Sequence, residues 1–196
     1  MNGPLDAALA VTAALDSCGV PYTVGGSLAS SFSGEPRASI DADIVVDMTP
    51  DQIAPFVDTL GAAFYVDREA LAGAVAARTS VNIIDRASGV KVDLFVAGSA
   101  LDRRQLARRV RVRVAADPDR FLYVHAPEDI LLQKLHWYRL GGEVSDRQWR
   151  DAISIIVVQG LRLDWDDLTT TAGALGLSDL LARASAEAGG PLKSAD

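Results

Sequence analysis

Pro127 divides the sequence into two parts with different periodicity. Before it, short apolar segments of strand length alternate with helical patterns, and the alternating run Val110-Arg111-Val112-Arg113-Val114 predicts a strand with one apolar face. After it, only helical patterns remain, separated by glycines. A chain with this pattern is expected to fold as an α/β (α+β) protein, with a mixed sheet flanked by helices and a helical bundle behind it in the sequence.

The periodicity and the turn residues give the expected elements. Strands are predicted at residues 22–24, 40–46, 63–66, 80–85, 90–96, 110–114 and 121–124. Helices are predicted at residues 4–18, 27–32, 51–60, 68–77, 127–141, 145–159, 164–175 and 178–188. We therefore expect a core at residues 1–126, a helical appendage at 127–188 and a flexible tail at 189–196.

Length and composition exclude several classes of protein. A chain of 196 residues can bury one core and a small bundle, and 49% hydrophobic residues exclude a wholly disordered protein. The single cysteine, Cys18, cannot form an internal disulfide, which favours a reducing compartment. The apolar residues 7–15 lie between Asp6 and Asp16 with no Lys or Arg before them, which argues against a signal peptide. We expect a cytoplasmic protein with no membrane partner.

Arginine is concentrated in one segment of an acidic chain. The net charge of −7 argues against general attraction to nucleic acid, although six arginines fall within residues 103–113. Arg109, Arg111 and Arg113 are expected on one strand face. A solvated outer face is the favoured interpretation, and an RNA-phosphate track is the alternative.

Three aspartates interrupt strands that are otherwise apolar. Asp41 and Asp43 are two apart in one strand and so point to the same face, and Asp93 lies among apolar residues in a later strand. Carboxylates on a core-facing strand repel each other and lose solvation unless a cation or an exposed strand end compensates. Oxygen ligands of this kind suit Mg²⁺ or Mn²⁺. A solvated strand face is the alternative for an isolated pair of aspartates.

The segment Gly25-Gly26-Ser27 strengthens the metal interpretation. It ends one predicted strand and begins a helix, with Ser27 expected as the helix cap. Backbone N–H groups in this arrangement bind phosphate. A phosphate-binding turn followed by a pair of acids and then a single acid indicates a site for a nucleotide and a divalent metal ion.

These three elements together resemble the nucleotidyltransferase fold superfamily. Its pattern is Gly-Gly or Gly-Ser at a helix start, Asp-x-Asp on the next strand and one acid on a further strand. The resemblance covers residues from about 20 to 96. It implies that Asp41, Asp43 and Asp93 are catalytic metal ligands and that Gly25-Gly26-Ser27 binds the nucleotide.

A narrower resemblance extends to about residue 160. The segment Arg37-Ala38-Ser39-Ile40-Asp41-Ala42-Asp43 is similar to the Arg-x-Ser/Thr-x-Asp-x-Asp of the abortive-infection (type IV toxin) nucleotidyltransferases. That family also carries a Lys and an Arg on a helix after the core and an Asp on the following helix, which Lys134, Arg139 and Asp151 match. The resemblance implies nucleotide binding by Arg37, Lys134 and Arg139 and a catalytic role for Asp151.

Helical periodicity gives an independent view of these later residues. Lys134 falls in the apolar stripe between Ile130 and Tyr138, so it either snorkels to solvent, forms an ion pair or points into a cleft. Contact with a triphosphate is the favoured interpretation. Arg139 lies on the opposite side of that helix, and Asp151 lies on the polar side of its own helix, where a solvated acid is the alternative. The two histidines, His125 and His136, have no ligand-spaced companions and are expected to be structural.

The expected function is metal-dependent transfer of a nucleotide from an NTP to an acceptor hydroxyl. The acceptor would be an RNA end such as that of tRNA, or a protein, and the resemblance implies a toxin of a toxin–antitoxin or phage-defence system with a cognate antitoxin. Two alternatives remain open. One is a nucleotide-binding accessory module without catalysis, and the other is an antibiotic-type adenylyltransferase that modifies a small molecule.

Overall fold

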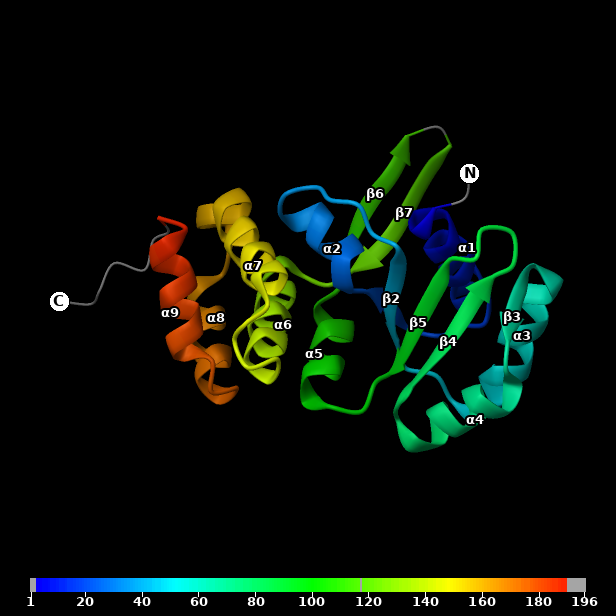
Figure 1. Ribbon diagram of the computed structural model, residues 1–196. Coiled ribbons are helices and arrows are strands. Elements are labelled where there is room, and N and C mark those ends of the chain that lie inside the picture. Colours follow the sequence, from blue (N-terminus) through cyan, green and yellow to red (C-terminus); the bar gives the residue numbers. More distant parts are fainter. Residues whose placement is uncertain (1–2, 117, 190–196) are drawn as a thin grey trace. The chain divides into compact units, whose positions relative to one another are not determined.

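A computed structural model describes residues 3–116 and 118–189 (Figure 1). The chain separates into two compact units, and each is described by itself. We call Met1–Ala29 with Ala38–His125 the core unit, and Ser30–Arg37 with Ala126–Asp196 the helical unit. The helical unit therefore includes an early segment of the chain as well as the C-terminal helices.

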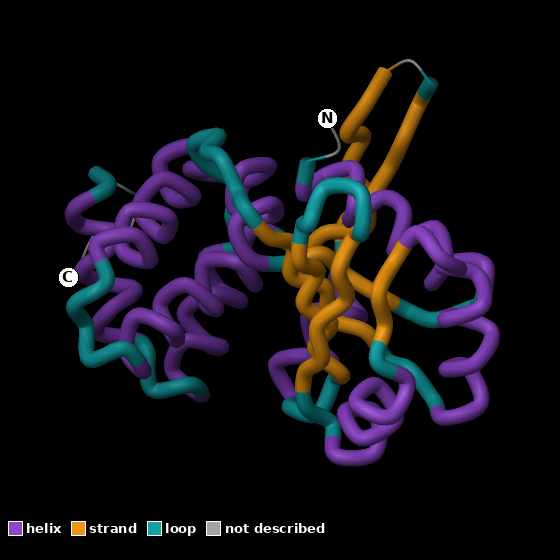
Figure 2. The backbone as a smooth tube through the Cα atoms, turned by 45° about the vertical axis from the view of Figure 1, so that its right-hand side comes forward, coloured by secondary structure: helices purple, strands orange, loops and turns teal. Residues whose placement is uncertain are grey.

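The core unit is built on a seven-stranded mixed sheet, with strand order β3-β4-β5-β2-β1-β7-β6 (Figures 1 and 2). The pairs β2–β5 and β1–β7 are parallel, and the other neighbouring pairs are antiparallel. The strands are β1 (Tyr22–Val24), β2 (Asp41–Val46), β3 (Phe64–Val66), β4 (Ser80–Asp85), β5 (Lys91–Val96), β6 (Val110–Ala116) and β7 (Asp119–Val124). The expected mixed sheet flanked by helices is confirmed.

Helices of the core unit cover this sheet (Figure 1). They are α1 (Pro4–Ser17), α2 (Gly26–Ser33, whose last four residues belong to the helical unit), α3 (Ile53–Leu60), α4 (Arg68–Ala77) and α5 (Ala100–Arg108), with 3-10 turns η1 (Pro50–Gln52) and η2 (Gly61–Ala63). Helix α1 packs on β1, β2 and β5, and α5 contacts β1 and β2. The alternation of β2 buries Ala42, Ile44 and Val46 completely, which places its two aspartates on the other face.

Helix α5 was not expected from the sequence. Ser99 caps it, since its hydroxyl accepts the N–H of Asp102, and the Asp102 carboxylate accepts the N–H of Ser99 at 2.8 Å. This reciprocal pair is a capping box. Serine followed three residues later by an acid was therefore the signal for this helix, and the arginine-rich composition of the segment obscured it.

The antiparallel pair β6–β7 extends beyond the rest of the sheet in Figure 1. Arg111 lies over the ring of Phe121 at 3.8 Å, and Arg109 lies over the ring of Tyr123 at 4.4 Å. Arg109 is the C-cap residue that follows α5, and it is not part of β6. Two of the three arginines thus cover aromatic rings, an arrangement that stabilises the hairpin through cation–π contact.

The helical unit contains the four helices expected after Pro127. They are α6 (Pro127–Leu140), α7 (Asp146–Gln159), α8 (Trp165–Ala174) and α9 (Ser178–Glu187), with the 3-10 turn η3 (Gly160–Arg162). Leucines and isoleucines of α6 and α7 form its core, and α9 packs on α7. Of the tail expected at 189–196, residues 190–196 lie outside the described residues. Within the described part of the chain, no helix combines the length and apolarity needed to cross a membrane.

Candidate functional site

The aspartates of β2 and β5 lie opposite one another in the sheet. The parallel register pairs Asp43 with Asp93, and Asp41 with Lys91. The residues that alternate with them, Ala42 and Val92, are fully buried on the opposite face. Only one face of the strand of Asp93 is buried, because β5 alternates between buried residues and residues that solvent reaches. The carboxylates therefore share a face that solvent reaches.

The start of α2 approaches this face closely. Gly26 adopts a positive φ of 58°, and a Cβ atom built on it would overlap Oδ2 of Asp43. The N–H of Gly25 donates to the carbonyl oxygen of Asp43 at 2.9 Å. Ser27 lies inside the first turn of α2 rather than at its cap, as α2 begins at Gly26. The glycine pair thus brings a helix N-terminus against the second aspartate of the pair.

His125 supports the same turn from below. Its Nδ1 lies 3.0 Å from the hydroxyl of Thr23, and its Nε2 would lie 2.6 Å from a Cβ atom at Gly25. Burial lowers the pKa of His125 to about 3, although the charge of Asp102 acts in the opposite direction. The ring is therefore neutral at physiological pH, and its packing explains why residue 25 is a glycine. The structural role expected for His125 includes this contact, which the sequence could not indicate.

Lys91 is a site residue that sequence reasoning missed. Its Nζ lies 2.8 Å from Oδ2 of Asp93. The hydrogen bond to Asp93 raises the pKa of Lys91, slight burial opposes this, and the charges of Asp93, Asp41 and Asp43 raise it further. The Lys-x-Asp spacing on a strand was the available signal, because residues two apart share a face.

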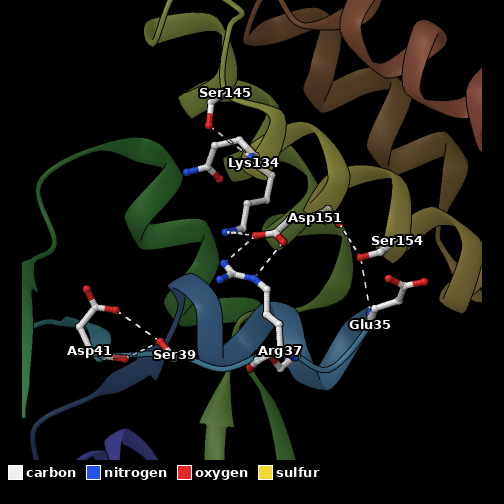
Figure 3. Close-up of polar contacts among 10 residues, drawn as sticks. Glu35, Arg37, Ser39, Asp41, Lys134, Ser145, Asp151 and Ser154 are labelled. Atoms are coloured by element: carbon white, nitrogen blue, oxygen red, sulfur yellow. Dashed lines mark hydrogen bonds and ion pairs between the residues drawn. The ribbon is translucent and has the colours of Figure 1, made fainter.

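Ser39 contacts Asp41, the first of the three aspartates. Its hydroxyl donates to the backbone oxygen of Asp41 at 2.8 Å and to Oδ1 of Asp41 at 3.3 Å (Figure 3). This contact fixes the start of β2 and orients the first aspartate of the pair.

The donor chemistry of this face fits a divalent metal ion. Asp93 Oδ1 is buried and has no hydrogen-bond partner among the described residues, and carboxylate oxygens are the ligands that Mg²⁺ and Mn²⁺ prefer. Across residues 3–116 and 118–189, no three Asp, Glu, His or Cys side chains converge closely enough to form a preassembled metal cage. Asp41, Asp43 and Asp93 are thus candidate ligands for such an ion.

A second polar cluster lies in the helical unit. Asp151 of α7 accepts hydrogen bonds from Arg37 through Oδ1 at 3.0 Å and Oδ2 at 2.9 Å, and Lys134 of α6 lies 2.8 Å from Oδ2 (Figure 3). The bidentate geometry is the strong form of an arginine–carboxylate pair. Three segments of the helical unit are therefore tied together by one carboxylate.

Burial distinguishes this cluster from a surface ion pair. The Lys134 side chain is 5% exposed and that of Asp151 is 8% exposed. Burial lowers the pKa of Lys134, Asp151 opposes this, and the charges of Arg37 and Arg147 lower the pKa further. The snorkelling alternative for Lys134 and the solvated alternative for Asp151 are both wrong, because each side chain is buried against the other.

A pocket of about 420 Å³ opens beside Arg37 and Asp151 in the helical unit. Its lining includes three arginines as well as three acids. The lining residues are Glu35, Pro36, Arg37, Asp146, Arg147, Arg150, Asp151 and Ser154. Arg147 and Arg150 are exposed, so this pocket presents guanidinium groups that suit a phosphate-bearing ligand.

Arg139 takes part in a different group of residues. It pairs with Glu143 at 2.8 Å and with Asp179 of α9 at 2.6 Å. The structure thus places Gly25, Gly26, Ser27, Asp41, Asp43 and Asp93 along one part of the core unit. In the helical unit it brings Arg37, Lys134 and Asp151 together, and Arg139 has other partners.

No protein-family model matches the sequence, and no curated protein is similar to it. An antigenic nucleotidyltransferase-like protein from Paracoccidioides brasiliensis is 18% identical, with 95% of this chain and 93% of that chain covered and a TM-score of 0.52. This chain has a nucleotidyltransferase-like fold. The antibiotic-resistance factor ANT(2'')-Ia is 16% identical, with 90% and 88% covered and a TM-score of 0.48.

Proposed function

We propose that this protein is a metal-dependent nucleotidyltransferase that moves a nucleotide from an NTP to the hydroxyl of an acceptor. One observation carries the proposal. Asp43 and Asp93 face each other in register on parallel strands, and the glycine turn that begins α2 lies against the carboxylate of Asp43. A helix N-terminus, which attracts anions, beside paired carboxylates, which attract metal ions, suits a nucleoside triphosphate and its metal ion.

The proposal gives each residue of the core unit a task. Asp41, Asp43 and Asp93 would hold Mg²⁺ or Mn²⁺, which stabilises charge on the triphosphate when bound. Backbone N–H groups at Gly26 and Ser27 would donate to phosphate oxygens. Asp93, whose Oδ1 has no hydrogen-bond partner among the described residues, would accept the proton of the acceptor hydroxyl.

The helical unit has a candidate phosphate-binding region of its own, beside the pocket lined by Arg37 and Asp151. We propose that Lys134 and Arg37 bind phosphate oxygens and that Asp151 holds both cations in place, since its carboxylate contacts each of them. The burial of Lys134 strengthens its interaction with an anion, because water screens it less. Arg139 is proposed to contribute less to phosphate binding than Lys134 and Arg37, because Glu143 and Asp179 already pair with it.

The acceptor is proposed to be an RNA end, such as that of tRNA, or a protein, and the activity is proposed to be toxic unless an antitoxin restrains it. The support is the similarity of the segment 37–43 to the abortive-infection nucleotidyltransferases. Induced expression should then arrest bacterial growth, and Asp41→Asn should abolish the arrest. Normal growth with active protein present would contradict the toxin role while leaving nucleotidyl transfer intact.

Labelled NTPs test the reaction itself. Purified protein is incubated with each α-labelled NTP and Mg²⁺, together with total RNA, total protein or hydroxyl-bearing antibiotics as acceptors. Label should enter one acceptor class with wild type and be lost in Asp43→Asn. Asp47→Asn is the matched control, because Asp47 pairs with Arg78 at an exposed position. NTP binding without transfer to any acceptor would favour a nucleotide-binding module, and label on an antibiotic would identify an antibiotic-modifying enzyme.

A further inference from the structure

Lys91 lies close enough to the candidate metal site for the charges of all three aspartates to act on it. It is two residues before Asp93 on β5, so both side chains leave the same face of the strand. The parallel register sets Lys91 opposite Asp41 on β2. Its ammonium contacts Asp93 Oδ2 at 2.8 Å, and the charges of all three aspartates act on it.

The two partners differ in how firmly they are held. The side chain of Lys91 is 46% exposed, whereas that of Asp93 is 13% exposed. An exposed lysine on a four-carbon stem gains little from one ion pair and can leave it at small cost. Asp93, in contrast, lies between the fully buried Val92 and Leu94 and has little freedom to follow. The ammonium is therefore the mobile partner.

We propose that, in the metal-free protein, Lys91 is the counter-ion of the three aspartate carboxylates and that a divalent metal ion displaces it. The inference rests on the proposed function, since it takes Asp41, Asp43 and Asp93 as metal ligands. A divalent ion held by the same carboxylates would stand close to the ammonium on Asp93 Oδ2, and the two positive charges repel each other, so the two cations compete. Lys91 reduces repulsion among the carboxylates in the metal-free protein and weakens the apparent metal affinity by the same contact.

Removal of the competing ammonium tests this directly. Mn²⁺ affinity is measured by calorimetry and by paramagnetic resonance for wild type, Lys91→Met and Arg68→Met. Lys91→Met keeps an unbranched side chain, one atom shorter and without charge, and should tighten Mn²⁺ binding by roughly five- to tenfold. Arg68→Met removes an equal charge from an exposed pair with Asp58 and controls for net charge. Equal or weaker Mn²⁺ binding in Lys91→Met than in Arg68→Met would overturn the proposal.

A direct observation of the ammonium provides the second measurement. The sequence has three lysines, Lys91, Lys134 and Lys193, so Cε-labelled lysine gives an NMR spectrum that single substitutions can assign. Saturating Mg²⁺ should shift the Lys91 resonance toward that seen in Asp93→Asn without metal. An unchanged resonance under saturating Mg²⁺ would show that the ion pair persists and would reject displacement.

These outcomes separate the two proposals. If wild type binds Mn²⁺ and Asp41→Asn does not, but Lys91→Met behaves as wild type, the metal site stands and the role of Lys91 is wrong. If no variant binds Mn²⁺ with or without NTP, the metal site of the proposed function fails and the competition fails with it.

Discussion

Gly26 meets two requirements that no other residue satisfies together. Its backbone has a φ of 58°, and the space where a Cβ atom would stand is taken by the carboxylate of Asp43. Gly26→Ala should therefore cost about 1–2 kcal/mol of unfolding free energy for the left-handed backbone and should also displace Asp43. We expect Mn²⁺ affinity and nucleotidyl transfer to be lost, as measured by calorimetry and the labelled-NTP assay.

Gly89→Ala is the matched control for this effect. Gly89 has a φ of 73° with nothing within 4 Å of a built Cβ atom, so alanine there has the backbone strain without the overlap. It should lose similar stability in urea unfolding and keep Mn²⁺ binding. Similar Mn²⁺ affinity in both variants would show that the close approach to Asp43 has no functional consequence.

His125 makes folding stability depend on pH in the acidic range. Its pKa is about 3 in the folded protein and 6.5 when unperturbed, so the unfolded chain binds more protons between these values. Stability should be unaffected by this residue above pH 6.5 and should fall as the pH is lowered below it, by up to about 1.4 kcal/mol per pH unit. Urea unfolding at pH 7, 6 and 5 measures the slope.

His125→Gln should flatten that slope, because glutamine does not titrate. His136→Gln serves as the control, since it removes the other histidine of the chain. The comparison uses slopes rather than absolute stabilities, so a general loss of stability in His125→Gln does not obscure the result. Identical slopes in wild type and His125→Gln would mean that His125 has the same pKa in the folded and unfolded states.

The site residues that could be predicted are those that break a strong local pattern. Asp41, Asp43 and Asp93 are visible because they interrupt apolar strands, and Gly26 because it stands between a strand and a helix. The contacts of His125 with Thr23 and Gly25 could not be predicted, since they join residues about a hundred positions apart. Pattern reveals residue type and face, whereas contact partners depend on the tertiary fold.

At the scale of elements, Asp151 connects helices α6 and α7 with the segment after α2. Asp151→Asn would leave the buried Lys134 and the Arg37 guanidinium without their carboxylate. We expect a loss of about 3 kcal/mol in unfolding free energy, because removing one member of a buried ion pair strands the other. Lys134→Met should cost about 1 kcal/mol or less, since Asp151 retains its bidentate pair with Arg37.

Urea unfolding of both variants gives the comparison. Asp146→Asn is the control on the same helix, at an exposed position. If Lys134→Met proved more damaging than Asp151→Asn, the carboxylate would not be the element that holds the cluster. Because Lys134→Met is expected to fold, a fall in its NTP affinity would report on nucleotide binding rather than on misfolding.

Most elements could be predicted because their local signals agree. The strands of the sheet alternate or are uniformly apolar, and the C-terminal helices are separated by glycines, so their positions match expectation within a few residues. Helix α5 is the exception. Its residues are too polar on average to suggest a packed helix, and the capping box at its start is its main signal in the sequence. Strand order also escaped prediction, because the placement of β7 beside β1 joins distant parts of the chain.

At the scale of the whole molecule, the helical unit is discontinuous in sequence. The segment Ser30–Arg37 belongs to it by contact, although the chain returns to this unit only at Ala126. Gln159 donates to the carbonyl oxygen of Ser33 at 2.6 Å, and Arg37 pairs with Asp151. The change of periodicity at Pro127 marks one boundary of the helical unit. It carries no information about the eight residues Ser30–Arg37, which belong to this unit but come from an earlier part of the chain.

This discontinuity predicts the behaviour of fragments. A peptide of residues 126–189 retains all four C-terminal helices but lacks the partners of Asp151 and Gln159 that come from 30–37. It should therefore melt at a lower temperature and less cooperatively than a fusion in which residues 30–37 are joined to it by a flexible Gly/Ser linker. Circular dichroism melts of the two peptides measure the difference.

Arg37→Ala in the fusion should remove much of the gain in stability, because Asp151 would then be paired with Lys134 alone. Equal melting of the bare peptide and the fusion would mean that α6 to α9 are self-sufficient and that the early segment contacts them without stabilising them.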